Sequence, residues 1–119
     1  MKYNDFFPYE NFRHQQEKII RIVEKAAKER KNTLLVAPNG TGKTIIALSA
    51  LLPIAYEENL KILYVCRTHA QNARIIKELI RVSKYLKNEN SKLNINFEVY
   101  TFTKLLSIYF SRILKFIEL

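Results

Sequence analysis

Residues 36–45 (VAPNGTGKTI) contain both glycines of the 119-residue chain, Gly40 and Gly42. Glycine adopts backbone angles that are closed to other residues and lets main-chain N–H groups approach an anion without a Cβ clash. Lys43 and Thr44 follow directly, so an ammonium group and a hydroxyl lie beside this bare backbone. Successive N–H groups at the start of a helix form a concave anion site, which the helix dipole also favours. The spacing therefore predicts a loop that binds the phosphates of a nucleotide.

The residues of this loop have separate roles. Lys43 would reach the β- and γ-phosphates, and the Thr44 hydroxyl would bind Mg²⁺. The pattern is A-x-x-G-x-G-K-T, with Ala37 where the strict P-loop motif has its first glycine. The alternative is a glycine-containing strand-to-helix turn that ends in Lys-Thr by chance. The predicted nucleotide-binding residues of the loop are Pro38, Asn39, Gly40, Thr41, Gly42, Lys43 and Thr44.

A strand before the loop and a helix after it are needed to hold this geometry. Thr33–Ala37 (TLLVA) is a short apolar run, typical of a strand buried on both faces. A helix is expected over Lys43–Glu58, with Pro53 kinking it or ending its first part. Upstream, apolar residues at three- and four-residue spacing predict a helix over Arg13–Lys31.

The same alternation continues downstream. Lys61–Cys66 is predicted as a second buried strand and His69–Leu86 as a second amphipathic helix. After a surface loop over Lys87–Lys92, a third strand is expected over Ile95–Thr101 and a final helix over Lys104–Leu119. This order predicts an α/β fold class with three parallel strands and flanking helices. The expected inner face of the second amphipathic helix comprises Ala73, Ile76, Leu79, Ile80 and Val82.

Composition restricts the classes of function. The chain has 20 Lys and Arg against 11 Asp and Glu, a formal net charge of +9. This surplus favours a polyanionic partner such as nucleic acid, and general solubility is the alternative. The single cysteine, Cys66, excludes an internal disulfide and fits a reducing compartment. A cytoplasmic location without a membrane partner is expected, since neither a secretion leader nor a membrane span is recognised.

Further residues carry a resemblance to superfamily 2 helicases, in which an alanine typically leads the P-loop. FFPYENFRHQQ, residues 6–16, looks like the adenine-recognition element that precedes the loop in this group, with Arg13 and Gln16 as its core. A glutamine amide can both donate to and accept from an adenine edge. Gln15 is the second candidate, and an ordinary polar helix start is the alternative. The resemblance implies ATP and Mg²⁺ as cofactors.

The stretch YVCRTHAQNARIIKEL, residues 64–79, is similar to the R-T-H-x-Q segment of the iron–sulphur DNA helicases of the XPD, FANCJ and RTEL kind. The resemblance implies that Arg67, Thr68 and His69 contact single-stranded DNA, as this segment does in that family. The alternatives are a solvated strand end and a capping or surface histidine. The family's [4Fe–4S] cluster needs cysteine thiolates. With Cys66 alone, no iron–sulphur cluster is expected within the chain.

The resemblance implies that residues 1–119 are an incomplete RecA-like helicase motor domain, a partial P-loop NTPase fold. Residues 1–12 are expected as an extended adenine-side segment, 13–86 as the motif-bearing core and 87–119 as a divergent tail. Helicase ATPases use an Asp-Glu pair to hold Mg²⁺ and position water. The sole aspartate, Asp5, precedes the loop, so this pair and a second motor domain are expected to be missing.

The expected function is that of an N-terminal, truncated part of an ATP-dependent DNA helicase. It would bind nucleotide, and single-stranded DNA, without hydrolysing ATP or unwinding alone, and whether it is an enzyme is left open. One alternative is a non-enzymatic nucleic-acid-binding or complex-forming subunit that completes a split helicase with a second chain. Another is a small stand-alone P-loop ATPase of a different type.

Overall fold

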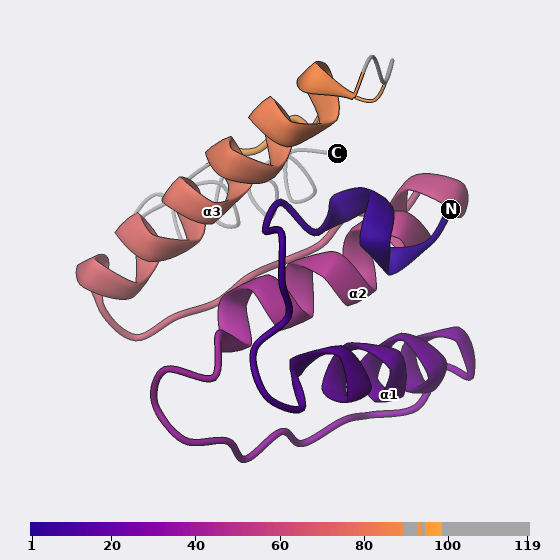
Figure 1. Cartoon of the computed structure of the whole chain (residues 1–119), viewed down its shortest axis with the longest axis vertical. Coiled ribbons are helices and arrows are strands. Elements are labelled where there is room, and N and C mark those ends of the chain that lie inside the picture. Colours follow the sequence, from indigo (N-terminus) through magenta and orange to yellow (C-terminus); the bar gives the residue numbers. More distant parts are fainter. Residues whose placement is uncertain (90–92, 94, 99–119) are drawn as a thin grey trace, which may run out of the picture.

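The computed structural model describes residues 1–89, 93 and 95–98. Within this part the regular elements are helical (Figure 1). They are the 3₁₀-helix η1 (Tyr3–Phe6) and the α-helices α1 (Gln16–Lys28), α2 (Lys43–Glu57) and α3 (His69–Asn88). The final helix expected over 104–119 lies outside the described residues, as does most of the expected tail.

The predicted sheet of three parallel strands is wrong for the part of the chain that the structure describes. Neither residues 33–37 nor residues 61–66 form a strand, and no backbone–backbone hydrogen bond starts or ends in either segment. Residues 95–98, from the third expected strand, are also irregular. The α/β fold class is therefore replaced by a helical arrangement.

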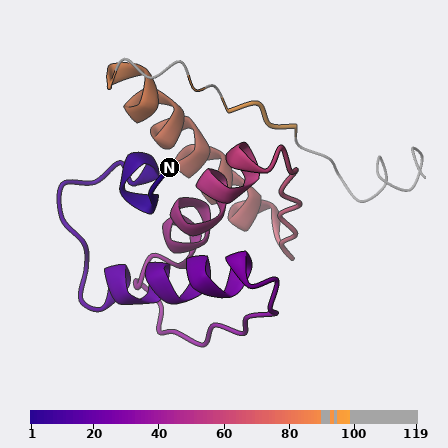
Figure 2. The same cartoon turned by 90° about the vertical axis from the view of Figure 1, so that its right-hand side faces the viewer.

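The strands are missing because the two apolar segments have no neighbour to pair with. Strand backbone groups are satisfied by ladder bonds to an adjacent strand, and these segments lie apart in both views (Figures 1 and 2). Their side chains are open to solvent. The exposed fractions are 91% for Leu34, 87% for Val36, 80% for Leu63 and 80% for Val65.

The path of the chain still has the winding expected of alternating strands and helices. In Figure 1, α1, α2 and α3 all begin toward the left, and segments 29–42 and 58–68 return to the left between them. The two expected strands thus run in one direction, but they are not side by side.

The three helices predicted within the described part are confirmed. α2 and α3 begin at Lys43 and His69 as predicted. α1 is shorter at both ends than the predicted Arg13–Lys31, because Gln15 (φ 57°) and Arg30 (φ 56°) have left-handed backbone angles that interrupt an α-helix. None of these helices is both long and apolar enough to cross a membrane.

The core lies around α2, which packs against α1, α3 and η1. The helix is apolar on most sides because it has neighbours on most sides. It continues past the buried Pro53 to Glu57, within one residue of its predicted end, so Pro53 does not end a first part of the helix. Its buried residues are Ile45, Ile46, Leu48, Ser49, Ala50, Pro53 and Ile54.

α3 docks by a face that differs from the predicted one. Val82 is buried as expected, but Ala73 and Ile80 are exposed. The buried positions are Ile75, Val82 and Leu86, at spacings of seven and four residues. These spacings return to the same side of an α-helix, which leaves the opposite side of α3 to solvent.

The N-terminal segment packs on α2, and η1 forms within it. Phe6 and Phe7 are buried, and the rings of Phe7 and Phe12 lie 4.3 Å apart. An aromatic segment of this length cannot bury its rings by itself, so packing on the helices stabilises it.

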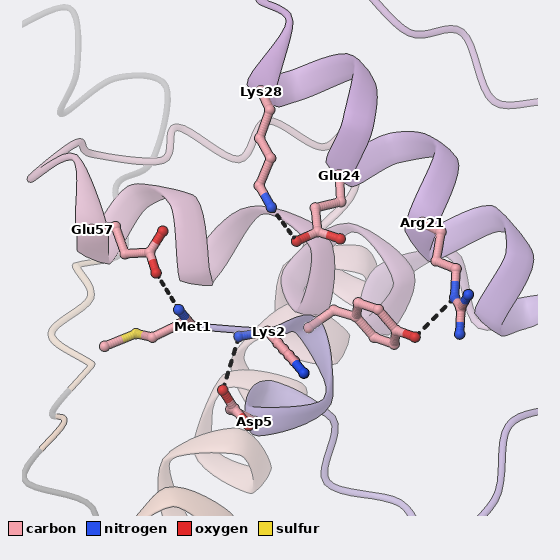
Figure 3. A network of polar contacts seen from close by, with 8 residues as sticks. Met1, Lys2, Asp5, Arg21, Glu24, Lys28 and Glu57 are labelled. Carbon is pink, nitrogen blue, oxygen red and sulfur yellow. Dashed lines mark hydrogen bonds and ion pairs between the residues drawn. The ribbon is translucent and has the colours of Figure 1, made fainter.

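Polar contacts hold this segment to two helices (Figure 3). The amino group of Met1 pairs with Glu57 at the end of α2. The Tyr3 hydroxyl donates to Glu17 Oε1 at 2.7 Å and accepts from Arg21 Nε at 2.9 Å, both on α1. The segment thus connects α1 to α2 just ahead of the residues that approach the glycine loop.

Candidate nucleotide-binding site

The glycine loop enters α2 in a conformation that suits an anion. Gly40 and Gly42 have φ angles of +85° and +80°, in the left-handed region that favours glycine. Gly42 is the N-cap residue of α2, and no side chain caps the helix. A Cβ at Gly40 would meet no atom within 4 Å. The open space beside Gly40 therefore adjoins a helix start whose N–H groups lack side-chain partners.

Polar side chains of the loop contact the loop's own backbone. Lys43 Nζ donates to the carbonyl oxygens of Ala37 at 2.7 Å and Pro38 at 3.3 Å. Thr41 Oγ1 donates to Pro38 O at 2.7 Å. Lys43 is exposed, so its ammonium can leave these carbonyls without disturbing the core. The half-buried Thr44 makes no side-chain hydrogen bond within the described residues.

Arg13, just before α1, and Gln16, at its start, bind carbonyl oxygens of the glycine loop. The Arg13 guanidinium donates to Gly40 O, and Gln16 Nε2 donates to Thr41 O at 3.1 Å. The N–H and C=O of a trans peptide point in opposite directions. Holding the Thr41 carbonyl toward Gln16 therefore turns the Gly42 N–H to the opposite side. Arg13 and Gln16 thus fix the orientation of two peptide groups in the loop.

Gln16 is buried, whereas adenine recognition needs an accessible side chain. Its side chain is 2% exposed, and Oε1 accepts from Arg13 N at 3.1 Å. Gln15, the second candidate, is exposed. Sequence reasoning selected Arg13 and Gln16 but missed their loop partners. Gly42 leaves room for this contact, because a Cβ there would lie 2.5 Å from Gln16 Nε2.

Arg67, Thr68 and His69 lie together where α3 begins. Thr68 is the N-cap: Oγ1 accepts from Gln71 N at 3.3 Å, and Gln71 Oε1 accepts from Thr68 N at 3.3 Å. This reciprocal pair is a capping box, so the capping role considered for His69 belongs to Thr68. The side chains of Arg67 and His69 are exposed, and neither has a hydrogen-bond or ion-pair partner in the part of the chain described.

The family described as type III restriction enzyme, res subunit, matches residues 9–117. The chain is 31% identical over 83 residues to a probable ATP-dependent helicase of Methanocaldococcus jannaschii, covering 68% of this chain and 12% of the relative. It is 33% identical over 87 residues to the general transcription and DNA repair factor IIH helicase subunit XPD/RAD3 of Saccharomyces cerevisiae, covering 70% and 11%. It is 34% identical over 76 residues to activating signal cointegrator 1 complex subunit 3 of Dictyostelium discoideum, covering 56% and 4%. No solved structure matches the chain.

These similarities confirm the resemblance to XPD-like helicases that the motifs indicated. The chain spans between 4% and 12% of the length of the three relatives. The family match includes the glycine loop, the start of α3 and the segment after Leu86, where the motif resemblance ended. The chain belongs to the type III restriction enzyme res subunit family.

Proposed function

We propose that the chain binds Mg²⁺-ATP through residues 38–44, as the nucleotide-binding part of an ATP-dependent helicase motor. The observation that carries this proposal is the helix start with Gly40 and Gly42 in left-handed conformations and Lys43 beside them. The open space where a Cβ at Gly40 would lie gives phosphate oxygens access to bare backbone. The ATP-dependent helicase similar to this chain supports the choice of nucleotide.

Binding would exchange internal contacts of the loop for contacts to phosphate. The ammonium of Lys43 leaves the carbonyls of Ala37 and Pro38 and donates to phosphate oxygens, which form stronger hydrogen bonds because both partners are then charged. Thr44 has a hydroxyl without a side-chain hydrogen bond in the described part, which suits a Mg²⁺ ligand. The ion neutralises phosphate charge when it is bound.

Adenine recognition is proposed for the residues before and at the start of α1. The Gln16 amide uses one N–H on Thr41 O and one oxygen lone pair on Arg13 N. An amide has two donors and two acceptor lone pairs, so one of each is unused, and the 2% exposed side chain has to turn outward to offer them to an adenine edge. Gln15 is the exposed alternative. Arg13 contributes by holding the loop at Gly40 O.

Single-stranded nucleic acid is the proposed partner at the start of α3. Arg67 offers a guanidinium free of partners among the described residues, and the first N–H groups of α3 lie beside it. Such groups suit phosphate contacts.

For ATP we propose binding and not hydrolysis, because the sole aspartate, Asp5, lies in η1, ahead of the glycine loop.

A second candidate function is assembly with another chain, a second copy of this one included, that covers exposed apolar side chains. The exposed apolar segments 33–37 and 61–66, with their unpaired backbone, favour it. Light scattering over a concentration series tests this candidate. A monomer that stays soluble at all concentrations would contradict it, whereas self-association through these segments would support it.

The nucleotide proposal is tested by competition against trinitrophenyl-ATP in the presence of Mg²⁺. Because the loop contacts phosphates and not the base, ATP should displace the probe best, ADP less well and AMP least. Inorganic tripolyphosphate should compete also, since it carries the same phosphate chain. Equal competition by ATP and AMP would show that the loop does not bind the β- and γ-phosphates.

A further inference from the structure

A row of cations follows the solvent side of α3. We call Arg74, Lys77, Arg81 and Lys84 the basic stripe. Their spacings of three and four residues place them within about 80° of arc and along roughly 15 Å of the helix. The stripe is opposite the face that buries Ile75, Val82 and Leu86, and α3 lies at the edge of the molecule in Figure 1.

Most of this charge is uncompensated. Arg74, Lys77 and Lys84 are exposed and have no hydrogen-bond or ion-pair partner among the residues that the structure describes. Arg81 pairs with Glu78 Oε1 at 3.0 Å. Glu78 is the only acidic residue of α3, and it is already occupied by this pair and by the hydroxyl of Tyr9.

A row of like charges at helical spacing repels itself and destabilises an isolated helix. A polyanion laid along the row removes that repulsion and releases its own counterions. Membrane docking would need an exposed apolar face on the same helix. The apolar side of α3 is instead buried against the core by Ile75, Val82 and Leu86. The charge pattern thus fits a phosphate backbone better than a lipid surface.

We propose that the basic stripe binds the phosphate backbone of a nucleic-acid strand and continues along α3 the contact that begins at Arg67 and His69. The proposal rests on the nucleic-acid part of the proposed function. Its own evidence is the stripe's position, since Arg74 lies only about 7.5 Å along the helix axis from His69, and both are exposed. A strand that is bound at the start of α3 and follows the solvent side of the helix therefore meets the stripe next.

The test uses two triple variants with the same loss of charge. In the stripe variant, Arg74, Lys77 and Lys84 are changed to Gln. In the control, the exposed Lys18, Lys25 and Lys31 near α1 are changed to Gln. Binding of a fluorescent oligothymidylate is measured by anisotropy over a range of salt concentrations. Three lost phosphate contacts should lower the slope of log K against log salt by about 2 in the stripe variant, with little change in the control.

Three further measurements separate the possible outcomes. A charge-preserving variant, Lys77→Arg with Lys84→Arg, should keep the wild-type slope, and trinitrophenyl-ATP binding should be the same in all variants. Equal slopes of log K against log salt for the two triple variants would overturn the proposal that the stripe binds nucleic acid. If Arg67→Gln weakens binding and the stripe variant does not, the proposed function stands and the stripe fails. Stronger binding of anionic phosphatidylserine vesicles than of oligonucleotide to the stripe would also overturn it, and no oligonucleotide binding by wild type would overturn both proposals.

Discussion

Replacing Gly42 by alanine should weaken the folded state more than the same change at Gly40. The two glycines have nearly the same φ, +80° and +85°, so a new Cβ is strained to a similar degree at each. Their surroundings differ. A Cβ at Gly42 would lie 2.5 Å from Gln16 Nε2, whereas one at Gly40 would meet nothing within 4 Å. The pair thus separates backbone strain from the contact with Gln16.

The expected losses follow from these two terms. A left-handed conformation costs a non-glycine residue about 1–2 kcal/mol, which is the whole effect expected for Gly40→Ala. In Gly42→Ala the Gln16 amide must also move and lose its bond to Thr41 O. The loss of a hydrogen bond adds about 0.5–1.5 kcal/mol. Gly42→Ala should therefore destabilise the protein by roughly 1 kcal/mol more than Gly40→Ala.

Urea unfolding followed by circular dichroism at 222 nm, the usual helix signal, measures both losses, provided that the slope m is unchanged between variants. A double variant, Gly42→Ala with Gln16→Ala, completes the comparison. With the amide removed, the stability lost through alanine at position 42 is measured against Gln16→Ala alone. It should be no larger than the loss in Gly40→Ala. Equal losses for the two single variants, or an unchanged cost at position 42 without Gln16, would refute the proposed contact.

Two other predictions concern the N-cap of α3 and the N-terminal tyrosines. Thr68→Ala removes the side-chain acceptor for Gln71 N and should lower the free energy of unfolding by about 1 kcal/mol; urea unfolding measures it, and no loss would contradict the cap. Burial, ahead of the hydrogen bonds to Glu17 and Glu78, raises the pKa of Tyr3 and of Tyr9. The unfolded chain then loses these protons first, so stability should fall as the pH rises above about 10. Changing both tyrosines to Phe should flatten that decline, and an identical pH dependence would contradict it.

The starts of α2 and α3 were predictable because their signals are local. Gly42 followed by Lys43 predicts the start of α2, and Thr68 followed three residues later by Gln71 is a capping box. These residues interact within one turn, so the sequence alone contains both partners. The ends of α1 were missed because Gln15 and Arg30 adopt left-handed angles that their residue types do not announce.

The absence of strands at residues 33–37 and 61–66 was not predictable from the residues of these segments. Thr33–Ala37 and Lys61–Cys66 have the composition of buried strands, yet pairing depends on a neighbour that a sequence window does not show. With the segments apart, their apolar side chains remain exposed.

The residues of the candidate site were predicted more fully than the contacts that those residues make. The glycines, Lys43 and Thr44 follow from the chemistry of phosphate binding. The contacts of Arg13 and Gln16 join residues 27 and 25 positions apart. Neither residue type indicates that its partner is a loop carbonyl, so these contacts needed the fold.

The central claim is that the loop binds nucleotide phosphate through Lys43. Equilibrium binding of trinitrophenyl-ATP to wild type, Lys43→Ala and Lys61→Ala tests it most directly. Lys61 is an exposed lysine near Ala27 and Glu58, at the opposite end of α2 from the loop. Loss of a charged hydrogen-bond partner costs about 1.5–3 kcal/mol, so Lys43→Ala should weaken binding roughly 10- to 100-fold, while Lys61→Ala binds like wild type. Equal affinities of wild type and Lys43→Ala would contradict the claim.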